Sequence, residues 1–467
     1  MAPAISEFTG KRISVVGMAR TGLAAAPVLK NLGAEVTLCD SRGVSELGSA
    51  LREAELMGVA LKVEAAPADC LRNTDLVIPS PGISRRSPVL ELAVQMGIPI
   101  MSEIEAAYRV AQAPILAVTG TNGKTTVTML LGEIIRRAGK KTYVGGNISA
   151  DDIKLPLIEA ASLARESDVI VAEISSFQLE WVEKFRPKIG ILTNISKDHL
   201  NRYASFDEYV EAKSAMFRAQ LPTDVAVINA VNAPAHAIGL KVPGRKYWFD
   251  RGNCETCDSA CVKNGIINVR WDCKDYPLGP ASDLKMLGTH NLENVLAAAG
   301  AAIAFGIDPD VVQEVIFEFS GVVHRMEYVA DVNGVKYYNN SMCTNVDAAV
   351  RSLEALPDDS VIIAGGVDKG SEFAPLGAMI SRKCRHLVVM GKDGHLIEAA
   401  AREAGFTSIS QADSMENAFE LARKAAKSGD IVMLSPACAS FDMYNDFEER
   451  GEHFRRIVRD MASGGAK

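Results

Sequence analysis

Short apolar strands and amphipathic helices alternate along this chain in three separate stretches. The pattern begins at residues 12–17, resumes after residue 103 and resumes again after residue 321. Since parallel strands need a long crossover, usually a helix, between them, this alternation favours parallel α/β layers. A chain of 467 residues has room for about three such domains. We therefore predict an α/β protein with three domains over residues 1–102, 103–320 and 321–467.

The predicted strands are short apolar runs that end at turn residues. They cover residues 12–17, 35–39, 76–79, 98–101, 115–118, 169–174, 189–193, 335–338, 361–364, 387–390 and 431–434. From about 245 to 287 the pattern changes to short β-like pieces, with a hairpin turn at Asn264-Gly265. This change predicts a mixed sheet in the central domain between two Rossmann-like domains.

Charge and composition exclude several classes of protein. Lys and Arg number 50 against 58 Asp and Glu, a net charge of −8, whereas a non-specific nucleic-acid binder is normally basic. No apolar run reaches the length of a membrane span, and the first residues lack the apolar region of a signal peptide. We expect a cytoplasmic protein with reduced thiols.

The strongest local motif lies between a predicted strand and a predicted helix. Residues 120–126 read Gly-Thr-Asn-Gly-Lys-Thr-Thr, although Val118 stands where a standard phosphate loop has its first glycine. Glycines let backbone N–H groups turn toward phosphate oxygens, and a helix N-terminus adds partial positive charge. Lys124 can reach the terminal phosphates, and the Thr125 hydroxyl can bind Mg²⁺. The alternative is a glycine-rich turn with a surface lysine. The motif predicts a P-loop-type central domain.

Two further segments follow predicted central strands. Glu173 ends one strand and precedes Ser175 and Gln178; its carboxylate suits Mg²⁺ or caps the next helix. Asp198 and His199 follow another strand, and a lone histidine there is more often structural. Lys213, on a predicted helix over 206–216, is either solvated or a desolvated amine able to take up carbon dioxide as a carbamate.

The amino-terminal segment 17–22, Gly-Met-Ala-Arg-Thr-Gly, only loosely matches a dinucleotide-binding turn. It places Arg20 at a helix start, where a diphosphate could bind, and Asp40 closes the next strand, where ribose contacts are usually made. The segment therefore favours a nucleotide site in the first domain.

Taken in order, these motifs resemble the Mur ligase family, and most closely its MurD type. Four further motifs support the resemblance: residues 288–294 (Gly-Thr-His-Asn-Leu-Glu-Asn), 324–327 (His-Arg-Met-Glu), 434–442 (Leu-Ser-Pro-Ala-Cys-Ala-Ser-Phe-Asp) and 447–451 (Phe-Glu-Glu-Arg-Gly). The resemblance covers essentially the whole chain. It implies an ATP- and Mg²⁺-dependent ligase that adds D-glutamate to UDP-MurNAc-L-Ala through an acyl phosphate. It also implies a role in peptidoglycan synthesis, and hence in cell-wall biogenesis, cell shape and cell division.

The resemblance assigns residues to three ligands. The loop residues Gly120, Asn122, Gly123, Lys124, Thr125 and Thr126 would bind ATP together with Asn291, Asn294 and Arg325. Thr125, Glu173, His199 and a carbamylated Lys213 would hold the metal, and Lys124, Glu173, His199 and Lys213 would be catalytic. The substrates would contact Arg20, Thr21, Asp40, Ser41, Arg42, Gly82, Asn147, Ser175, Gln178, Thr344, Lys369, Ser440 and Phe447.

Two features depart from the family. Residues 340–345 read Asn-Ser-Met-Cys-Thr-Asn, where the MurD type usually has Asp-Ser-Lys-Ala-Thr-Asn, so a carboxylate and a lysine are both missing. Cys254, Cys257, Cys261 and Cys273 cluster around the predicted hairpin, which suggests either free thiols, the default, or a structural metal.

These departures leave alternatives open. One is a MurD-like ligase for another amino acid, such as L-glutamate, and another is a nucleotide-binding regulator without turnover. In each case we expect a monomer that binds small molecules, without nucleic acid or a membrane span.

Overall fold

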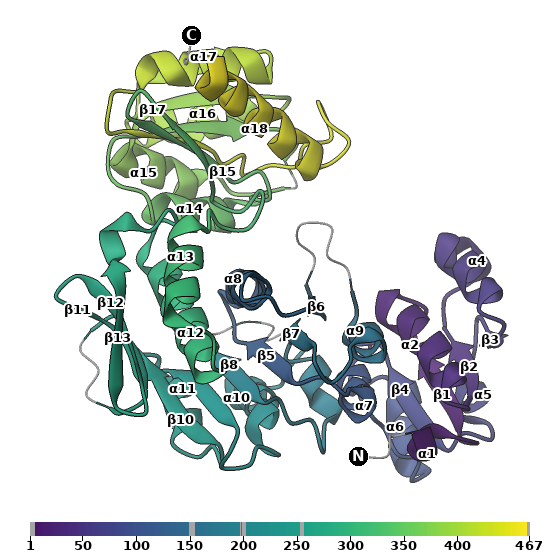
Figure 1. Ribbon diagram of the computed structural model, residues 1–467. Helices are drawn as coiled ribbons and strands as arrows, with labels where there is room; N and C mark the ends of the chain where they lie inside the picture. The colour runs from purple at the N-terminus through teal and green to yellow at the C-terminus, as the bar shows by residue number, and fades with distance from the viewer. Residues whose placement is uncertain are drawn as a thin grey trace. The chain divides into compact units, whose positions relative to one another are not determined.

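The computed structural model describes residues 5–148, 155–196, 198, 202–252, 256–368 and 370–464. The described elements form three sheets (Figure 1), each within one of the stretches where the sequence alternates. The chain divides into two compact units. Unit 1 comprises Met1–Ser282 and Glu293–Ile316, and unit 2 comprises Asp283–Leu292 and Phe317–Lys467. Among the described residues, no helix combines the length and apolarity needed to cross a bilayer.

The first sheet is parallel, with the order β3-β2-β1-β4. Its strands are β1 Arg12–Val16, β2 Glu35–Cys39, β3 Ala60–Lys62 and β4 Leu76–Pro79. Its helices are α1 Ile5–Phe8, α2 Arg20–Asn31, α3 Val44–Leu47, α4 Ser49–Leu56, α5 Pro67–Leu71 and α6 Pro88–Gln95. The chain reverses its order between β1 and β4, which is where α/β sheets place ligands.

The strand predicted at residues 98–101 is wrong. Only a single parallel bridge joins Val77 to Ile100, supported by backbone hydrogen bonds from Val77 to Pro99 and from Met101 to Val77. Pairing stops there because Ser102 caps the next helix, its hydroxyl accepting the Glu105 backbone N–H.

The central sheet has nine strands in the order β13-β12-β11-β10-β9-β8-β5-β7-β6. They are β5 Ile115–Thr119, β6 Thr142–Gly146, β7 Val169–Glu173, β8 Ile189–Leu192, β9 Val225–Asn229, β10 Arg245–Phe249, β11 Ser259–Lys263, β12 Ile266–Trp271 and β13 Lys274–Pro280. The sheet is mixed, as predicted, since the pairs β11–β12 and β12–β13 are antiparallel. Asn264 and Gly265 both have positive φ in the predicted hairpin turn.

Helices accompany this sheet and lead out of it. They are α7 Glu103–Val110, α8 Lys124–Arg137, α9 Leu157–Leu163, η1 Gln178–Trp181, α10 Phe206–Ser214, η2 Ala215–Phe217, α11 Ala233–Gly239, η3 Ala281–Asp283, α12 Thr289–Ala304 and α13 Pro309–Glu318. The boundary between the units runs through α12, so Asn291 belongs to unit 2 and Asn294 to unit 1.

The third sheet has the order β14-β15-β19-β16-β17-β18 and is parallel except for the β14–β15 pair. Its strands are β14 Glu327–Val332, β15 Val335–Asn339, β16 Ser360–Gly365, β17 Cys384–Met390, β18 Ile409–Ala412 and β19 Ile431–Leu434. Its helices are α14 Val346–Glu354, α15 Ala374–Lys383, α16 Gly394–Glu403, α17 Met415–Ala425 and α18 Phe447–Gly464. Two apolar clusters contain residues from the core of this sheet.

The cysteine-rich segment differs from the expectation of free thiols. Cys257 and Cys273 form a disulfide, with Cα atoms 4.3 Å apart, while Cys261 is a buried free thiol. The paired strands bring the two positions together, and the Cys273 backbone N–H donates to the Cys257 carbonyl. Cys254 lies outside the described residues, and within them no three metal-ligating side chains gather.

Candidate active site

The phosphate-loop segment joins β5 to α8, and two of its glycines are required by their surroundings. Gly120 has φ +147°, and a Cβ there would lie 1.9 Å from Thr193 Oγ1. Gly123 has φ +83°, and a Cβ there would lie 2.2 Å from Asn294 Oδ1. Any side chain at either position would therefore meet both a strained backbone and a neighbouring side chain. The predicted ATP residue Asn294 thus lies over the start of α8.

The loop is held by the segment that follows β8. Thr121 N donates to the Asn194 carbonyl at 2.8 Å, and Asn122 N donates to Asn194 Oδ1 at 3.0 Å. Thr193 Oγ1 donates to the Asn122 carbonyl at 2.6 Å. β5 and β8 are neighbours in the sheet, so their carboxyl ends place these two segments together. The loop is thereby fixed in a turn at the N-terminus of α8, where an anion is favoured.

Thr125 connects this loop to Glu173 at the end of β7. Thr125 Oγ1 donates to Glu173 Oε2 at 2.7 Å, and Asn147 Nδ2 donates to Glu173 Oε1 at 3.2 Å. Glu173 is buried, and its two oxygens point to these partners and not to the start of the next helix. The interpretation of Glu173 as a cap is therefore wrong. Lys124 folds back, with Nζ donating to the Thr121 carbonyl at 2.9 Å, and Thr126 is buried.

Lys213 lies in this site and is not solvated, which corrects the simpler of the two predictions. The residue is 2% exposed, and its Nζ donates to the Gly120 carbonyl at 2.8 Å. Burial, and then the positive charge of Lys124, lower the pKa of Lys213 to about 7. Tyr209 lies beneath the ammonium group, and its hydroxyl is 3.0 Å from Thr121 Oγ1. His199 lies outside the described residues.

Ser175 and Gln178 contact each other in the segment after β7. The Ser175 backbone N–H and hydroxyl both donate to Gln178 Oε1, at 2.9 and 3.1 Å. Gln178 is buried beside Glu103, and burial raises the pKa of that carboxyl to about 7. Glu103 could not be singled out from the sequence, because an acidic residue in a first helical turn is common.

The predicted residues of the first domain meet at the carboxyl ends of β1, β2 and β4. Asp40 accepts the Met18 backbone N–H at 2.7 Å and pairs with the Arg42 guanidinium at 2.7 Å. Burial acts to raise the pKa of Asp40, but the Arg42 side chain and the backbone N–H groups of Arg42 and Met18 outweigh it and lower the pKa to about 2. Arg20 Nη1 donates to the Ile148 carbonyl at 3.1 Å. Thr21 is half-buried, while Ser41 and Gly82 are exposed.

In unit 2, the altered segment 340–343 forms internal contacts. Asn340 Oδ1 accepts the Met326 backbone N–H at 3.1 Å, and Nδ2 donates to Ser352 Oγ at 2.8 Å. The asparagine thus uses an amide donor that a carboxylate lacks. Cys343 is buried, which raises the pKa of its thiol.

Phe447, one of the residues predicted to bind glutamate, is linked through Ser341 to a buried arginine that the sequence did not reveal. Arg450 is 2% exposed; its Nε donates to Ser341 Oγ at 3.0 Å, and Ser341 Oγ donates to the Phe447 carbonyl at 2.8 Å. Ser440 is buried and Thr344 half-buried, whereas Lys369 lies outside the described residues.

The remaining predicted ATP residues also belong to unit 2. Asn291 Nδ2 donates to the Leu287 carbonyl at 2.7 Å, and Arg325 is exposed.

Family comparisons cover the chain in three consecutive parts. Residues 11–102 match the Mur ligase MurD-like N-terminal domain, 118–302 the Mur ligase middle domain, and 324–438 the Mur ligase glutamate ligase domain. Among solved structures, UDP-N-acetylmuramate-alanine ligase MurC from Thermotoga maritima is 20% identical with a TM-score of 0.54, over 96% of this chain and 99% of that one. The D-alanyl-D-alanyl-adding Mur ligase from Acinetobacter baumannii is 16% identical with a TM-score of 0.57, over 98% and 97%. These structures support the fold.

Curated relatives are closer. The UDP-N-acetylmuramoylalanine–D-glutamate ligase of Pelotomaculum thermopropionicum is 42% identical over 98% of this chain and 100% of its own length. The protein of the same name from Caldanaerobacter subterraneus subsp. tengcongensis is 40% identical over 97% and 99%. Identity at this level over the whole length, together with three matching domains, establishes the relationship suggested by the motifs: the chain belongs to the Mur ligase family, in its MurD type.

Proposed function

We propose that the chain is an ATP-dependent, ADP-forming ligase that adds D-glutamate to UDP-N-acetylmuramoyl-L-alanine in peptidoglycan precursor synthesis. The relatives that carry this activity in their names align over their whole length. This chemistry is supported above all by the hydrogen bond from Thr125 of the phosphate loop to Glu173, beside the buried Lys213.

The reaction needs activation because a carboxylate is a poor electrophile. A carboxylate oxygen of the UDP-sugar attacks the γ-phosphorus of ATP, the bond to ADP breaks, and an acyl phosphate forms. The glutamate amine then attacks the acyl carbon, phosphate leaves with the bonding electrons, and the nitrogen loses a proton. Loop N–H groups at the start of α8 and Lys124 would hold the phosphates in line for the first step.

The donor set fits a hard cation. The Thr125 hydroxyl and the Glu173 carboxylate supply oxygen ligands of the kind that Mg²⁺ prefers, and His199 and Lys213 would complete the metal sites. When bound, Mg²⁺ supplies positive charge that lets two anionic substrates approach each other.

Lys213 supports the carbamate assignment. Only a neutral amine attacks carbon dioxide, and a lysine with a pKa near 7 is substantially neutral under physiological conditions. The nitrogen forms a bond to the carbon of CO₂ and releases a proton, which leaves a carbamate anion. Such an anion gives the site a second carboxylate-like ligand without a second acidic residue.

The other ligands are assigned by domain. The UDP-sugar would contact Arg20, Thr21, Asp40, Ser41, Arg42, Gly82 and Asn147, with Ser175 and Gln178 beside it. ATP would also contact Asn291, Asn294 and Arg325, and glutamate would contact Thr344, Lys369, Ser440 and Phe447. The domain limits 1–102, 103–320 and 321–467, the monomeric state and the cytoplasmic location remain part of this proposal.

A second candidate is a ligase for another amino acid. It is favoured by the 340–343 segment, where Asn340 is committed to internal hydrogen bonds and Met342 replaces the lysine of the family. Phosphate release from ATP with UDP-N-acetylmuramoyl-L-alanine distinguishes the candidates. Release that requires D-glutamate supports the main proposal, and release that requires L-glutamate supports the second. No release with D-glutamate, L-glutamate or water as acceptor would leave a regulatory role.

A further inference from the structure

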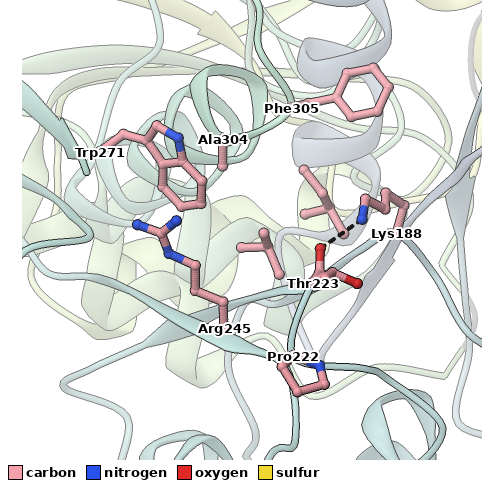
Figure 2. A pocket seen from close by; sticks show the side chains of 9 residues that line it. Lys188, Pro222, Thr223, Arg245, Trp271, Ala304 and Phe305 are labelled. Atoms are coloured by element: carbon pink, nitrogen blue, oxygen red, sulfur yellow. Dashed lines mark hydrogen bonds between the residues drawn. The ribbon is translucent and has the colours of Figure 1, made fainter.

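A cleft lies at the end of the central sheet where the parallel strands begin, opposite the end that carries the phosphate loop. Lys188 immediately precedes β8, Val225 begins β9 and Arg245 begins β10. Because β12 runs antiparallel to β11, its last residue, Trp271, lies at the same end of the sheet. Phe305 follows α12. These side chains line a cleft of about 480 Å³ (Figure 2), a volume within the range of small-molecule sites.

One part of the cleft wall is apolar. Trp271 and Phe305 lie on either side of Ala304, and Pro222 lies across the cleft from them (Figure 2); all three are accessible to solvent. Rings that remain accessible in a concave surface offer a flat ligand contact area at low conformational cost.

The polar part contains a rigidly held guanidinium. The Arg245 guanidinium carbon lies 3.8 Å from the centre of the Trp271 ring, and both Nε and Nη2 donate to Asp258, at 2.6 and 2.7 Å. Nη2 also donates to Asp272 at 2.6 Å. Nη1 has no hydrogen-bond partner in the part of the chain that the structure describes. The carboxylates thus fix the arginine fork and leave one nitrogen available to a ligand.

Lys188 supplies a second cation to the same wall. Its Nζ donates to the Thr223 carbonyl at 2.6 Å (Figure 2) and lies 3.3 Å from Asp224 Oδ1. Arg186 also pairs with Asp224, at 3.5 Å. Lys188 and Arg245, the two cations that line the cleft, and Arg186, which does not line it, are therefore matched by three carboxylates, Asp224, Asp258 and Asp272. Because these charges cancel, a ligand with several negative charges is not stabilised here, and a single carboxylate would be held by hydrogen bonds from N–H groups and not by a net positive field.

We propose that this cleft is a binding site for a small aromatic monocarboxylate. The ligand's ring would pack against Ala304 between Trp271 and Phe305, and its carboxylate would accept a hydrogen bond from Lys188 Nζ. This site is separate from the phosphate loop and does not depend on the proposed reaction, since none of its residues has been assigned to ATP, UDP-sugar or glutamate.

The test uses 2-naphthoate as the probe and 2-naphthamide as its neutral analogue of the same shape. Calorimetric titration is carried out on the full chain with a non-hydrolysable ATP analogue and UDP at saturation, so that the nucleotide sites are occupied. We expect one naphthoate per chain and at least about tenfold weaker binding of the amide, because a charge-assisted hydrogen bond is lost. Absence of binding, equal binding of both compounds, or displacement of naphthoate by the nucleotides would overturn the proposal.

Variants locate the site. Lys188→Met and Phe305→Ala should each weaken naphthoate binding about tenfold, through loss of the charged and the apolar contact. Lys246→Met is the matched control, because Lys246 is an exposed lysine that does not line the cleft. An unchanged affinity in both cleft variants, or an equal loss in the control, would show that the probe binds elsewhere. Substrate-dependent phosphate release by each variant verifies that it is folded.

Discussion

Replacing Lys213 with methionine should stabilise unit 1 while removing activity. Methionine has a similar apolar stem but no amine to be desolvated. The pKa of Lys213 in the folded state is about 7, against an ordinary value of 10.5. The unfolded chain therefore binds more protons between these two pH values, and the stability of the wild type rises with pH across that interval.

The size of the effect follows from the pKa difference. The charged lysine costs the folded state about 5 kcal/mol at pH below 7, a cost that disappears as the pH approaches 10.5. Methionine removes this cost but leaves the Gly120 carbonyl without its donor, a loss of about 1 kcal/mol. The net gain of about 4 kcal/mol at pH 7 corresponds to roughly 6 °C in the melting temperature of a unit of about 300 residues.

The assay is thermal unfolding of wild type and Lys213→Met at several pH values from 6 to 10. Chelator and CO₂-free buffer keep metal and carbamate out of the measurement. We expect the variant to be more stable at pH 7, the difference to shrink toward pH 10, and phosphate release to be lost. A variant that is no more stable than wild type at pH 7, or a difference that does not change with pH, would refute the reasoning.

Three further predictions concern the loop and the disulfide. Lys124→Ala should lower substrate-dependent phosphate release by at least about 100-fold with unchanged melting temperature, since loss of one preorganised group at the transition state slows a reaction by about that factor. Lys140 is exposed, and Lys140→Ala serves as the control. Gly123→Ala should lower the melting temperature of the ligand-free protein, because its Cβ would lie 2.2 Å from Asn294 Oδ1. Adding Asn294→Ala should relieve the clash but not the strain of a positive φ, and complete recovery of the melting temperature would contradict this account. Cys257→Ser should destabilise the 257–273 segment by about 3 kcal/mol, seen as faster amide exchange there, while leaving phosphate release intact; unchanged exchange would contradict a stabilising cross-link.

The sequence predicted most strands because turn residues bound them. Residues 76–79 form β4 with the same limits, ended by the turn at Ser80-Pro81-Gly82. The loop at 120–126 was also predictable, because its two glycines, Lys124 and Thr125 stand in one short run between an apolar strand and a helix. In both cases the signal is local, so a short window of sequence contains it.

The features that could not be predicted depend on distant parts of the chain. Lys213 on a polar helix resembles any solvated lysine, and only the approach of Gly120, 93 residues away, shows that it is buried. Arg450 lies among charged residues in sequence, yet Ser341 and Cys438 enclose it. The strand predicted at 98–101 was wrong for the opposite reason. Its local pattern suits a strand, but the helix capped by Ser102 follows at once, so only Ile100 pairs with β4.

The division of the chain into units also affects how the protein can be made. During synthesis, residues 283–292 leave the ribosome before residues 293–316, which complete unit 1. Unit 1 can therefore close only after part of unit 2 has already emerged. A recombinant fragment that begins at Phe317 would lack this early piece, in which the Lys285 carbonyl accepts the hydroxyl of the buried Tyr338 at 2.9 Å and Leu287 packs on the core. Expression of the carboxy-terminal unit by itself therefore needs residues 283–292 joined to it through a designed linker.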